Sequence, residues 1–370
     1  MNDTEDLQHL NVHEEYLIFK GVFYELAPVT IPLCLIVLVQ NTLLFVDYFR
    51  EKAKLVPCFF MGIALADILK AQGELVLALI SVFVYTGVCN VEVLYRSLLY
   101  YMVSALPGVN CSKVINLAMT LTLTINVVNP FRRIDTARVK KVVSSICLIV
   151  TCLHFLDTII FVIAHWKFLK DINVLPYMYD MIFYFLMLGF QFPGVVTIMA
   201  IFCSCNRVDE VKCGYSPHQI IGLSSFCAFL YLVVPPLTVL ACMVIQIKHL
   251  RGGIQDEEAS PLLPNTVRHV SITVLIVSLL FFLCNIAYIA NLVMTLSKVY
   301  YRITKVDPPP ADQDYVNLGI LQGVTEFILP LIYAAVYPVI LVSRKPELRV
   351  RYRRGLRRVL PCCLHEVITT

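Results

Sequence analysis

The sequence is poor in charged residues. Only 15% of its 370 residues are Asp, Glu, Lys or Arg, whereas about 25% are charged in ordinary soluble domains. Hydrophobic residues make up 58% of the chain and the mean hydropathy is +0.76. These values exclude a soluble globular protein and leave a polytopic membrane protein as the only broad class. Tryptophan occurs once, so aromatic belts at the membrane surface must rely on Tyr and Phe.

Signatures of membrane-embedded chemistry are also absent. The chain has no Gly-x-Ser-Gly segment, no pair of catalytic aspartate motifs and no cluster of histidine ligands. It shows no internal repeat of the kind found in inverted-repeat transporters. We therefore expect that the protein is not an enzyme and uses no cofactor, metal site or nucleic-acid partner.

Long apolar stretches dominate what is present, and a span needs about 20 apolar residues. Candidates lie near 27–49, 57–86, 96–128, 142–166, 178–204, 217–247, 268–297 and 316–343. Basic residues cluster in 50–56, 129–141 and 344–358. Because Lys and Arg are enriched in cytoplasmic segments, all three segments are expected on the cytoplasmic side. The N-terminus then lies outside, the number of spans is odd, and one of the eight stretches does not cross.

The weakest candidate is 178–204, which contains an acidic residue and a central Pro-Gly pair. We predict that 167–216 is one long second outer loop. In the alternative prediction 178–204 is a true span, and either 142–166 or 217–247 does not cross. Both predictions give an all-α membrane protein whose fold is a seven-transmembrane helix bundle.

The predicted bundle covers residues 27–343 and is flanked by two polar segments. Residues 1–26 lack the basic start and apolar core of a cleavable signal peptide, so the first span is expected to act as the membrane signal. They form an extracellular tail with a glycosylation sequon at Asn2. The breaker-rich link 249–267 is predicted as a cytoplasmic loop, and 298–315 as an outer loop.

Residues 344–370 form a predicted basic cytoplasmic tail. Its arginine-rich beginning is expected to fold as a short amphipathic helix that lies on anionic membrane lipids. Cys362 and Cys363 follow this helix and are candidates for palmitoylation, which would add a second membrane anchor.

Three ionisable residues interrupt the second apolar stretch. Asp67, Lys70 and Glu74 have the spacing i, i+3, i+7 and therefore share one helix face. A charge at the bilayer centre costs roughly 3 kcal/mol, so such residues usually face a bundle interior and carry function. We expect a Lys70–Glu74 ion pair that either lines a cavity or is purely structural. His154, Asp157 and Glu326 are further buried ionisable candidates.

An ordered set of motifs accompanies the predicted spans. In chain order it comprises Asn41, Ile63-Ala-Leu-Ala-Asp67, Pro130 before a basic loop, Pro235-Pro236, Phe281-x-x-Cys284 and Tyr337-Pro338. The set resembles the rhodopsin-like (class A) G-protein-coupled receptors over about residues 27–363, in the form of a divergent, invertebrate-type member. The resemblance implies a multi-pass plasma-membrane receptor that binds an extracellular ligand and signals to a heterotrimeric G protein by helix rearrangement.

The resemblance also assigns residue roles. Lys70, Glu74, Asn285 and Glu326 become candidates for the ligand cavity, and Pro235 and Pro338 become helix hinges. Asp67 occupies the position where many family members hold a sodium ion, with Ser112 at a matching position in the third span. Because the Lys70 ammonium lies one turn away and would neutralise Asp67, we predict weak or no sodium dependence.

The family also joins the outer end of helix three to the second outer loop by a disulfide. Cys213 matches the loop partner, but the usual helix-three position is Leu98. The resemblance therefore implies a Cys89–Cys213 pair, with Cys203 and Cys205 as rival partners.

Departures from the family pattern keep other functions open. Leu123 occupies the position of the arginine that closes the inner side of family members, and the aromatic residue and proline of helix six are replaced within Cys284-Asn285-Ile286-Ala287. One alternative is a decoy or scavenger receptor that does not signal. Another is an ion channel or transporter that uses the face carrying Asp67, Lys70 and Glu74 as an ion path.

Overall fold

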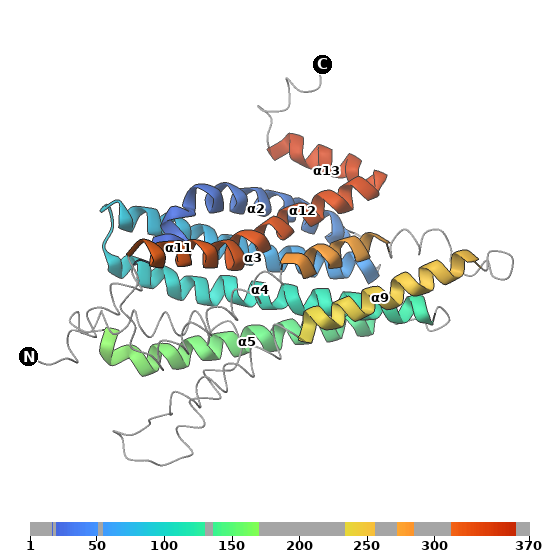
Figure 1. The fold of residues 1–370 in the computed structure, drawn as a ribbon, viewed down its shortest axis with the longest axis horizontal. Helices are drawn as coiled ribbons and strands as arrows, with labels where there is room; N and C mark the ends of the chain where they lie inside the picture. The colour runs from blue at the N-terminus through green and yellow to red at the C-terminus, as the bar shows by residue number, and fades with distance from the viewer. Residues whose placement is uncertain are drawn as a thin grey trace, which may run out of the picture.

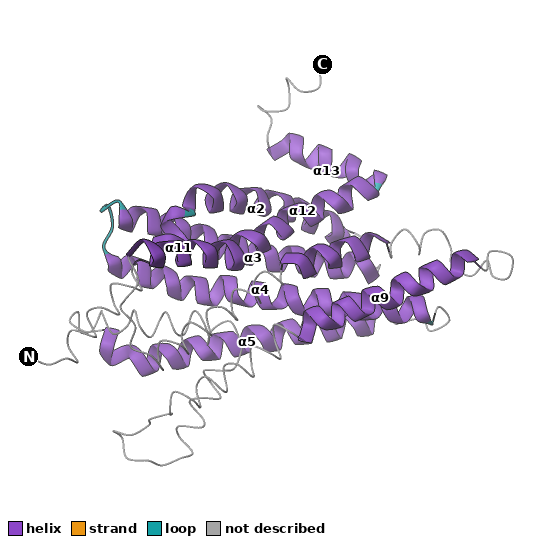
Figure 2. Ribbon diagram, in the orientation of Figure 1, coloured by secondary structure: helices purple, strands orange, loops and turns teal. Residues whose placement is uncertain are grey.

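The computed structural model describes Leu17 and residues 20–50, 55–129, 136–169, 234–255, 272–284 and 312–359. These residues form helices and short connections, with no strand among them (Figures 1 and 2). The elements in chain order are η1 (Lys20–Glu25), α2 (Ala27–Arg50), α3 (Leu55–Tyr85), α4 (Val91–Val128), α5 (Thr136–Leu169), α9 (Val234–Gln255), a helix at Ile272–Cys284, α11 (Asp312–Gly323), η5 (Val324–Ile328), α12 (Leu329–Arg344) and α13 (Pro346–Val359). The η elements are π-helices.

Within the described residues, five helices are long and apolar enough to cross a membrane, which agrees with the predicted all-α membrane class, while the bundle of seven helices stays a prediction. They are Ala27–Phe49, Val56–Tyr85, Val103–Val128, Ala137–Ile159 and Val316–Arg344. Two shorter apolar helices, Val234–His249 and Ile272–Cys284, lie within two more of the predicted stretches. The predicted outer segment 178–204 lies outside the described residues.

Some helices extend into segments that were predicted as loops. α9 continues to Gln255 through Gly252-Gly253, into the predicted inner loop at about 249–267. A helical glycine costs about 1 kcal/mol relative to alanine, which is too little to end a helix on its own. The loops predicted at 298–315 and 167–216 likewise overlap the first turn of α11 and the last residues of α5.

Neighbouring helices pack side by side along the long axis of the molecule (Figure 1). The closest packing joins α3 and α4, where two glycines lie at the crossing. A Cβ atom at Gly108 would lie 2.5 Å from the Ala66 carbonyl oxygen, and one at Gly73 would lie 2.7 Å from the Ala105 Cβ atom. Small residues let membrane helices approach this closely, and the approach brings the polar residues of α3 against α4.

A chain of aromatic rings forms the centre of the core. Tyr48 stacks on Phe60, Phe60 on Tyr337 and Tyr337 on Tyr333, and Tyr333 meets the edge of Phe281. Neighbouring ring centroids are 5.3–6.3 Å apart, within the range of favourable aromatic pairs. The chain connects α2, α3, α12 and the helix Ile272–Cys284.

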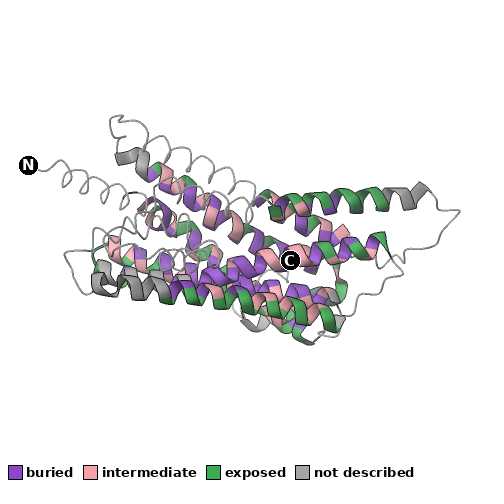
Figure 3. Cartoon of the chain, turned by 90° about the horizontal axis from the view of Figure 1, so that it is seen from below, coloured by how far each residue is buried: buried purple, intermediate pink, exposed green. Residues whose placement is uncertain are grey.

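The outer faces of the helices carry large apolar side chains. Leu148 and Ile149 on α5 and Val244 on α9 are all more than half exposed. Figure 3 shows that the described helices carry both buried and exposed positions. An apolar surface of this kind is what a helix presents to lipid.

Elements at both ends of the described chain pack onto the bundle. The N-terminal η1, which belongs to the segment predicted as a tail, packs against α11 and α3. A Cβ atom at Gly21 would overlap the Val316 carbonyl oxygen, and Phe23 meets the edge of Phe327. At the other end α13 is the predicted helix after the last span: Leu348 is buried in the core, and Gly355 packs against Leu43 of α2.

Candidate functional site

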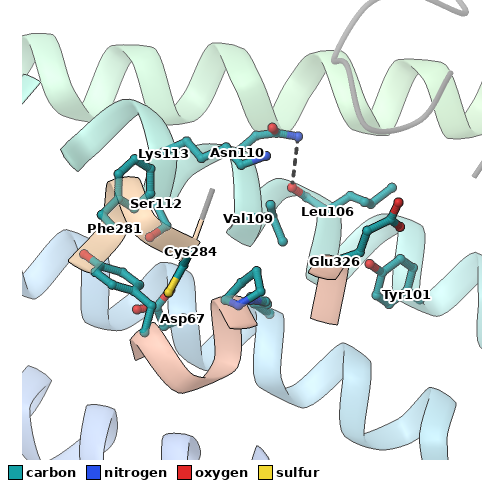
Figure 4. A pocket seen from close by; sticks show the side chains of 13 residues that line it. Asp67, Tyr101, Leu106, Val109, Asn110, Ser112, Lys113, Phe281, Cys284 and Glu326 are labelled. Atoms are coloured by element: carbon teal, nitrogen blue, oxygen red, sulfur yellow. Dashed lines mark hydrogen bonds between the residues drawn. The ribbon is translucent and has the colours of Figure 1, made fainter. Parts of the chain in front are cut away.

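A cavity lies between α3, α4, the helix Ile272–Cys284 and the η5–α12 segment (Figure 4). Its volume is about 60 Å³, which is room for a few water molecules. The lining combines ionisable, polar and apolar side chains. It comprises Asp67, Lys70, Tyr101, Leu106, Val109, Asn110, Ser112, Lys113, Phe281, Cys284, Glu326, Pro330 and Tyr333.

The predicted ion pair is present. Lys70 Nζ lies 3.9 Å from Glu74 Oε1, and the two side chains are 3% and 1% exposed. The pair is a consequence of the i, i+4 spacing on α3. Lys70 lines the cavity but Glu74 does not, so Glu74 acts on the cavity through its partner. The ammonium group thus pairs with Glu74, and it also attracts the Asp67 carboxylate.

Asp67 occupies the wall of the cavity beside Ser112. Its side chain is 2% exposed, the Ser112 hydroxyl hydrogen-bonds it, and the Tyr337 hydroxyl lies beside it. Its second carboxylate oxygen, Oδ2, has no hydrogen-bond partner among the described residues. Figure 4 shows Asp67 on the same side of the cavity as Ser112, Phe281 and Cys284.

A proline explains how the first and last helices are joined next to Asp67. Pro338 lies inside α12 and has no backbone N–H to donate to the Ala334 carbonyl one turn earlier. Asn41 Nδ2 donates to that carbonyl at 3.0 Å, while the Tyr337 hydroxyl donates to Asn41 Oδ1. The side chain of α2 therefore satisfies the group that the proline leaves unpaired. Pro338 and Asn41, two separate sequence signals, belong to one contact.

Glu326 reaches the cavity from the η5 segment. A π-helix shifts the register of the residues that follow it and is frequent at functional sites. Gln322 Nε2 donates to Glu326 Oε2 at 3.4 Å, and Figure 4 shows Glu326 beside Tyr101 on the side of the cavity away from Asp67. The sequence prediction that Glu326 lines a cavity agrees with this position.

Lys113 and Asn110 are polar cavity residues that were not predicted from the sequence. Lys113 of α4 lines the cavity and interacts electrostatically with Lys70 and Glu326. Asn110, one turn earlier, lies 2.7 Å from His154 Nε2 through its Nδ2 atom. A lysine in an apolar stretch is itself a functional signal, so the argument applied to Lys70 was sufficient to find Lys113 as well.

We call Asp67, Lys70, Glu74, Lys113 and Glu326 the charged cluster. A second group of buried polar side chains, the neutral cluster, lies on the α4 turns that follow. Thr120 Oγ1 is 3.0 Å from Ser278 Oγ, and Gln246 Nε2 donates to Thr124 Oγ1 at 2.7 Å. Thr120, Thr124, Gln246 and Ser278 thereby join α4 to α9 and to the helix Ile272–Cys284. Leu123 is buried beside them.

The remaining predicted site residues have mixed outcomes. Asn285, Cys213, Asn2, Cys362 and Cys363 lie outside the described residues. Cys89 carries a free thiol in this structure, so the structure does not support the disulfide predicted between Cys89 and Cys213.

The described residues contain no group of three His, Cys, Asp or Glu side chains arranged to hold a metal ion. Pro235 lies in the first turn of the described part of α9, and its role as a hinge stays a prediction.

No protein-family model matches this chain, and no curated protein matches it.

Proposed function

We propose that the protein is a rhodopsin-like G-protein-coupled receptor of the plasma membrane. Its N-terminus lies outside and its C-terminus in the cytoplasm. It binds an extracellular ligand in the cavity beside Asp67 and signals by rearranging α9 and the helix Ile272–Cys284. The observation that carries the proposal is the contact in which Asn41, Asp67 and Tyr337 meet next to the cavity. The first, second and last apolar helices each contribute one polar side chain there, at the motif positions on which the resemblance rests.

The arrangement of the helices supports the proposal. The five long apolar helices and the two shorter ones follow the chain order of seven of the eight apolar stretches. The helix ends that lead into the basic segments fall at the end of the bundle where α12 gives way to α13, as expected for a cytoplasmic side. The arginines of α13 face anionic lipid there.

The packing supplies a route from the cavity to the cytoplasmic end. Phe281 and Tyr333 line the cavity and also belong to the aromatic chain. A ligand that displaces Phe281 moves the helix Ile272–Cys284, which also carries Ser278. That movement opens the Thr120–Ser278 contact of the neutral cluster and exposes the cytoplasmic end of α4 to a G protein.

Nucleotide exchange on purified heterotrimeric G proteins tests the proposal. The full chain is reconstituted in lipid nanodiscs with each G-protein class, and GTP-analogue binding is followed without added ligand. We expect the natural sequence to accelerate exchange and Leu123→Arg to change that rate, because a cation at this position adds a charge to the neutral cluster. Leu123→Met is the matched control and should leave the rate unchanged.

A decoy receptor is the second candidate, because Leu123 replaces the arginine with which family members close the inner side. Silence of both the natural sequence and Leu123→Arg with every G-protein class would contradict signalling and favour the decoy. Ion flux in liposomes that is lost in Asp67→Asn would instead favour a channel or transporter.

A further inference from the structure

The charged cluster contains one more carboxylate than it has ammonium groups. Lys70 pairs with Glu74 at 3.9 Å, and Lys113 attracts Glu326 across the cavity. Lys70 also attracts Asp67, so two ammonium groups are shared among three carboxylates. In its ordinary ionised state the cluster therefore carries one net negative charge inside an apolar bundle, where an uncompensated charge is costly.

The unmatched charge has a defined position and direction. Asp67 is 2% exposed, it lines the cavity, and its Oδ2 atom has no hydrogen-bond partner among the described residues. The Ser112 hydroxyl stands beside it as a further hydrogen-bonding group. A donor that carries a positive charge would satisfy both the charge and the vacant hydrogen-bonding capacity of Asp67.

Two ammonium groups also line the cavity, but Lys70 pairs with Glu74 and Lys113 interacts with Glu326. The lining next to Asp67 favours an organic cation over a bare metal ion. Beside Asp67 the cavity is walled by Phe281, Cys284, Pro330 and Tyr333, which offer apolar surface and aromatic faces rather than a shell of oxygen ligands. Aromatic faces attract ammonium groups, and apolar walls gain by covering a hydrocarbon body. The cavity volume of about 60 Å³ suits a small group such as a short alkylamine and excludes a large body.

We propose that the cavity recognises a short alkylammonium group, either a small amine or the amine end of a larger ligand, with its ammonium at Asp67 and its carbon body against Phe281 and Tyr333. The inference deepens the proposed receptor function by naming the chemical class of the ligand. It concerns binding alone, so it is tested without a G protein.

The first experiment compares three probes of the same shape on the purified full-length protein in nanodiscs. Isobutylamine is cationic at neutral pH, isobutanol is neutral and isobutyrate is anionic. We expect isobutylamine to raise the unfolding temperature in a saturable manner and to give a calorimetric binding isotherm. Isobutanol and isobutyrate should give no saturable shift, because neither places a positive charge at Asp67.

The second experiment locates the ammonium group. Asp67→Asn keeps the shape but removes the charge, and it should weaken isobutylamine binding by about tenfold or more. Ser112→Ala removes only the neighbouring hydroxyl and should weaken binding by about threefold. Asp47→Asn is the matched control, because Asp47 is a buried aspartate of α2 that does not line the cavity, and its affinity should equal that of the natural sequence.

Specific results overturn the proposal. Any one of four results would do so: equal stabilisation by isobutanol, unchanged isobutylamine affinity in Asp67→Asn, no binding of isobutylamine to the folded natural protein, or an equal shift from sodium chloride. If Asp67→Asn does not fold, the proposal is judged from two other results. These are the preference of the natural protein for isobutylamine over isobutanol and the loss of affinity in Ser112→Ala. Amine binding without nucleotide exchange would leave this inference standing and remove the signalling function. Nucleotide exchange activated by a ligand that is not an amine would support the signalling function and contradict this inference.

Discussion

The charged cluster and the neutral cluster stabilise buried polar side chains in different ways. Both place polar side chains of α4 in the interior of an apolar bundle, about 16 Å apart along that helix as measured from Lys113 to Thr124. The charged cluster uses pairs of opposite charge around a cavity. The neutral cluster uses hydroxyl and amide hydrogen bonds between three helices.

The difference lies in what happens when one member is lost. Removing one partner of a buried ion pair leaves an uncompensated charge and typically costs about 3–5 kcal/mol, whereas losing one neutral hydrogen bond typically costs about 1 kcal/mol. A region that must hold its shape around a cavity is therefore well served by charges. A region that must open and close is better served by neutral contacts, because each one costs little to break.

Substitution of Lys70 should give the largest difference in stability between the charged and the neutral cluster. Lys70→Met leaves Asp67 and Glu74 without their nearest cation, so we expect a loss of about 3–5 kcal/mol in the free energy of unfolding, measured by denaturant titration of the purified protein. The double variant Lys70→Met with Glu74→Leu should recover much of that loss. Lys248→Met is the control, because Lys248 is an exposed lysine of α9. An equal effect of Lys70→Met and Lys248→Met would disprove the role of the Lys70–Glu74 pair.

The α3–α4 crossing brings the charged cluster together, and a substitution there should have the next largest effect on stability. Gly108→Ala places a Cβ atom 2.5 Å from the Ala66 carbonyl oxygen, and the backbone shift that follows should cost about 1–3 kcal/mol. Gly62→Ala is the matched control, because its Cβ would meet only the movable Ile115 Cδ1 at 3.1 Å. Equal stability of the two variants in thermal unfolding would show that the helices do not cross at Gly108.

The neutral cluster should respond more weakly to substitution. Gln246→Leu and Thr124→Val each remove one side of the 2.7 Å hydrogen bond, and each should cost about 0.5–1.5 kcal/mol. A double-mutant cycle should show coupling between the two positions, because they share that bond. Strictly additive losses would mean that Gln246 and Thr124 do not interact in the folded protein.

Sodium should have the smallest effect. The lining next to Asp67 is apolar and aromatic, so sodium meets a shortage of oxygen ligands. We expect the same unfolding temperature in sodium chloride and in N-methylglucamine chloride. A sodium-specific rise that disappears in Asp67→Asn would contradict this prediction and would bring the charged cluster closer to the usual family site.

Helix positions could be predicted from the sequence because an apolar run of membrane-spanning length satisfies its backbone polar groups in lipid by forming a helix. The Lys70–Glu74 pair could be predicted because it lies within one helix, where spacing determines proximity. The bond from Asn41 to the Ala334 carbonyl could not, because its two groups are 293 residues apart and spacing says nothing about which helices adjoin.

The neutral cluster was missed for a different reason. Thr, Ser and Gln are common in membrane helices, and each usually bonds to its own helix, as Thr120 and Thr124 also do. Only the packing of three helices shows which hydroxyls are shared between them. The end of α9 was missed because glycine pairs mark loops only on average.

The close fit of η1 onto α11 has a practical consequence for protein engineering. Because Gly21 and Gly323 each lie against backbone or side-chain atoms of the opposite segment, residues 20–26 are part of the folded body and not a neutral leader. A purification tag or fluorescent fusion joined at this point would press against α11 and disturb the helix that carries Glu326. Fusions should therefore be placed ahead of Leu17, and a truncated expression variant should retain Lys20 onwards.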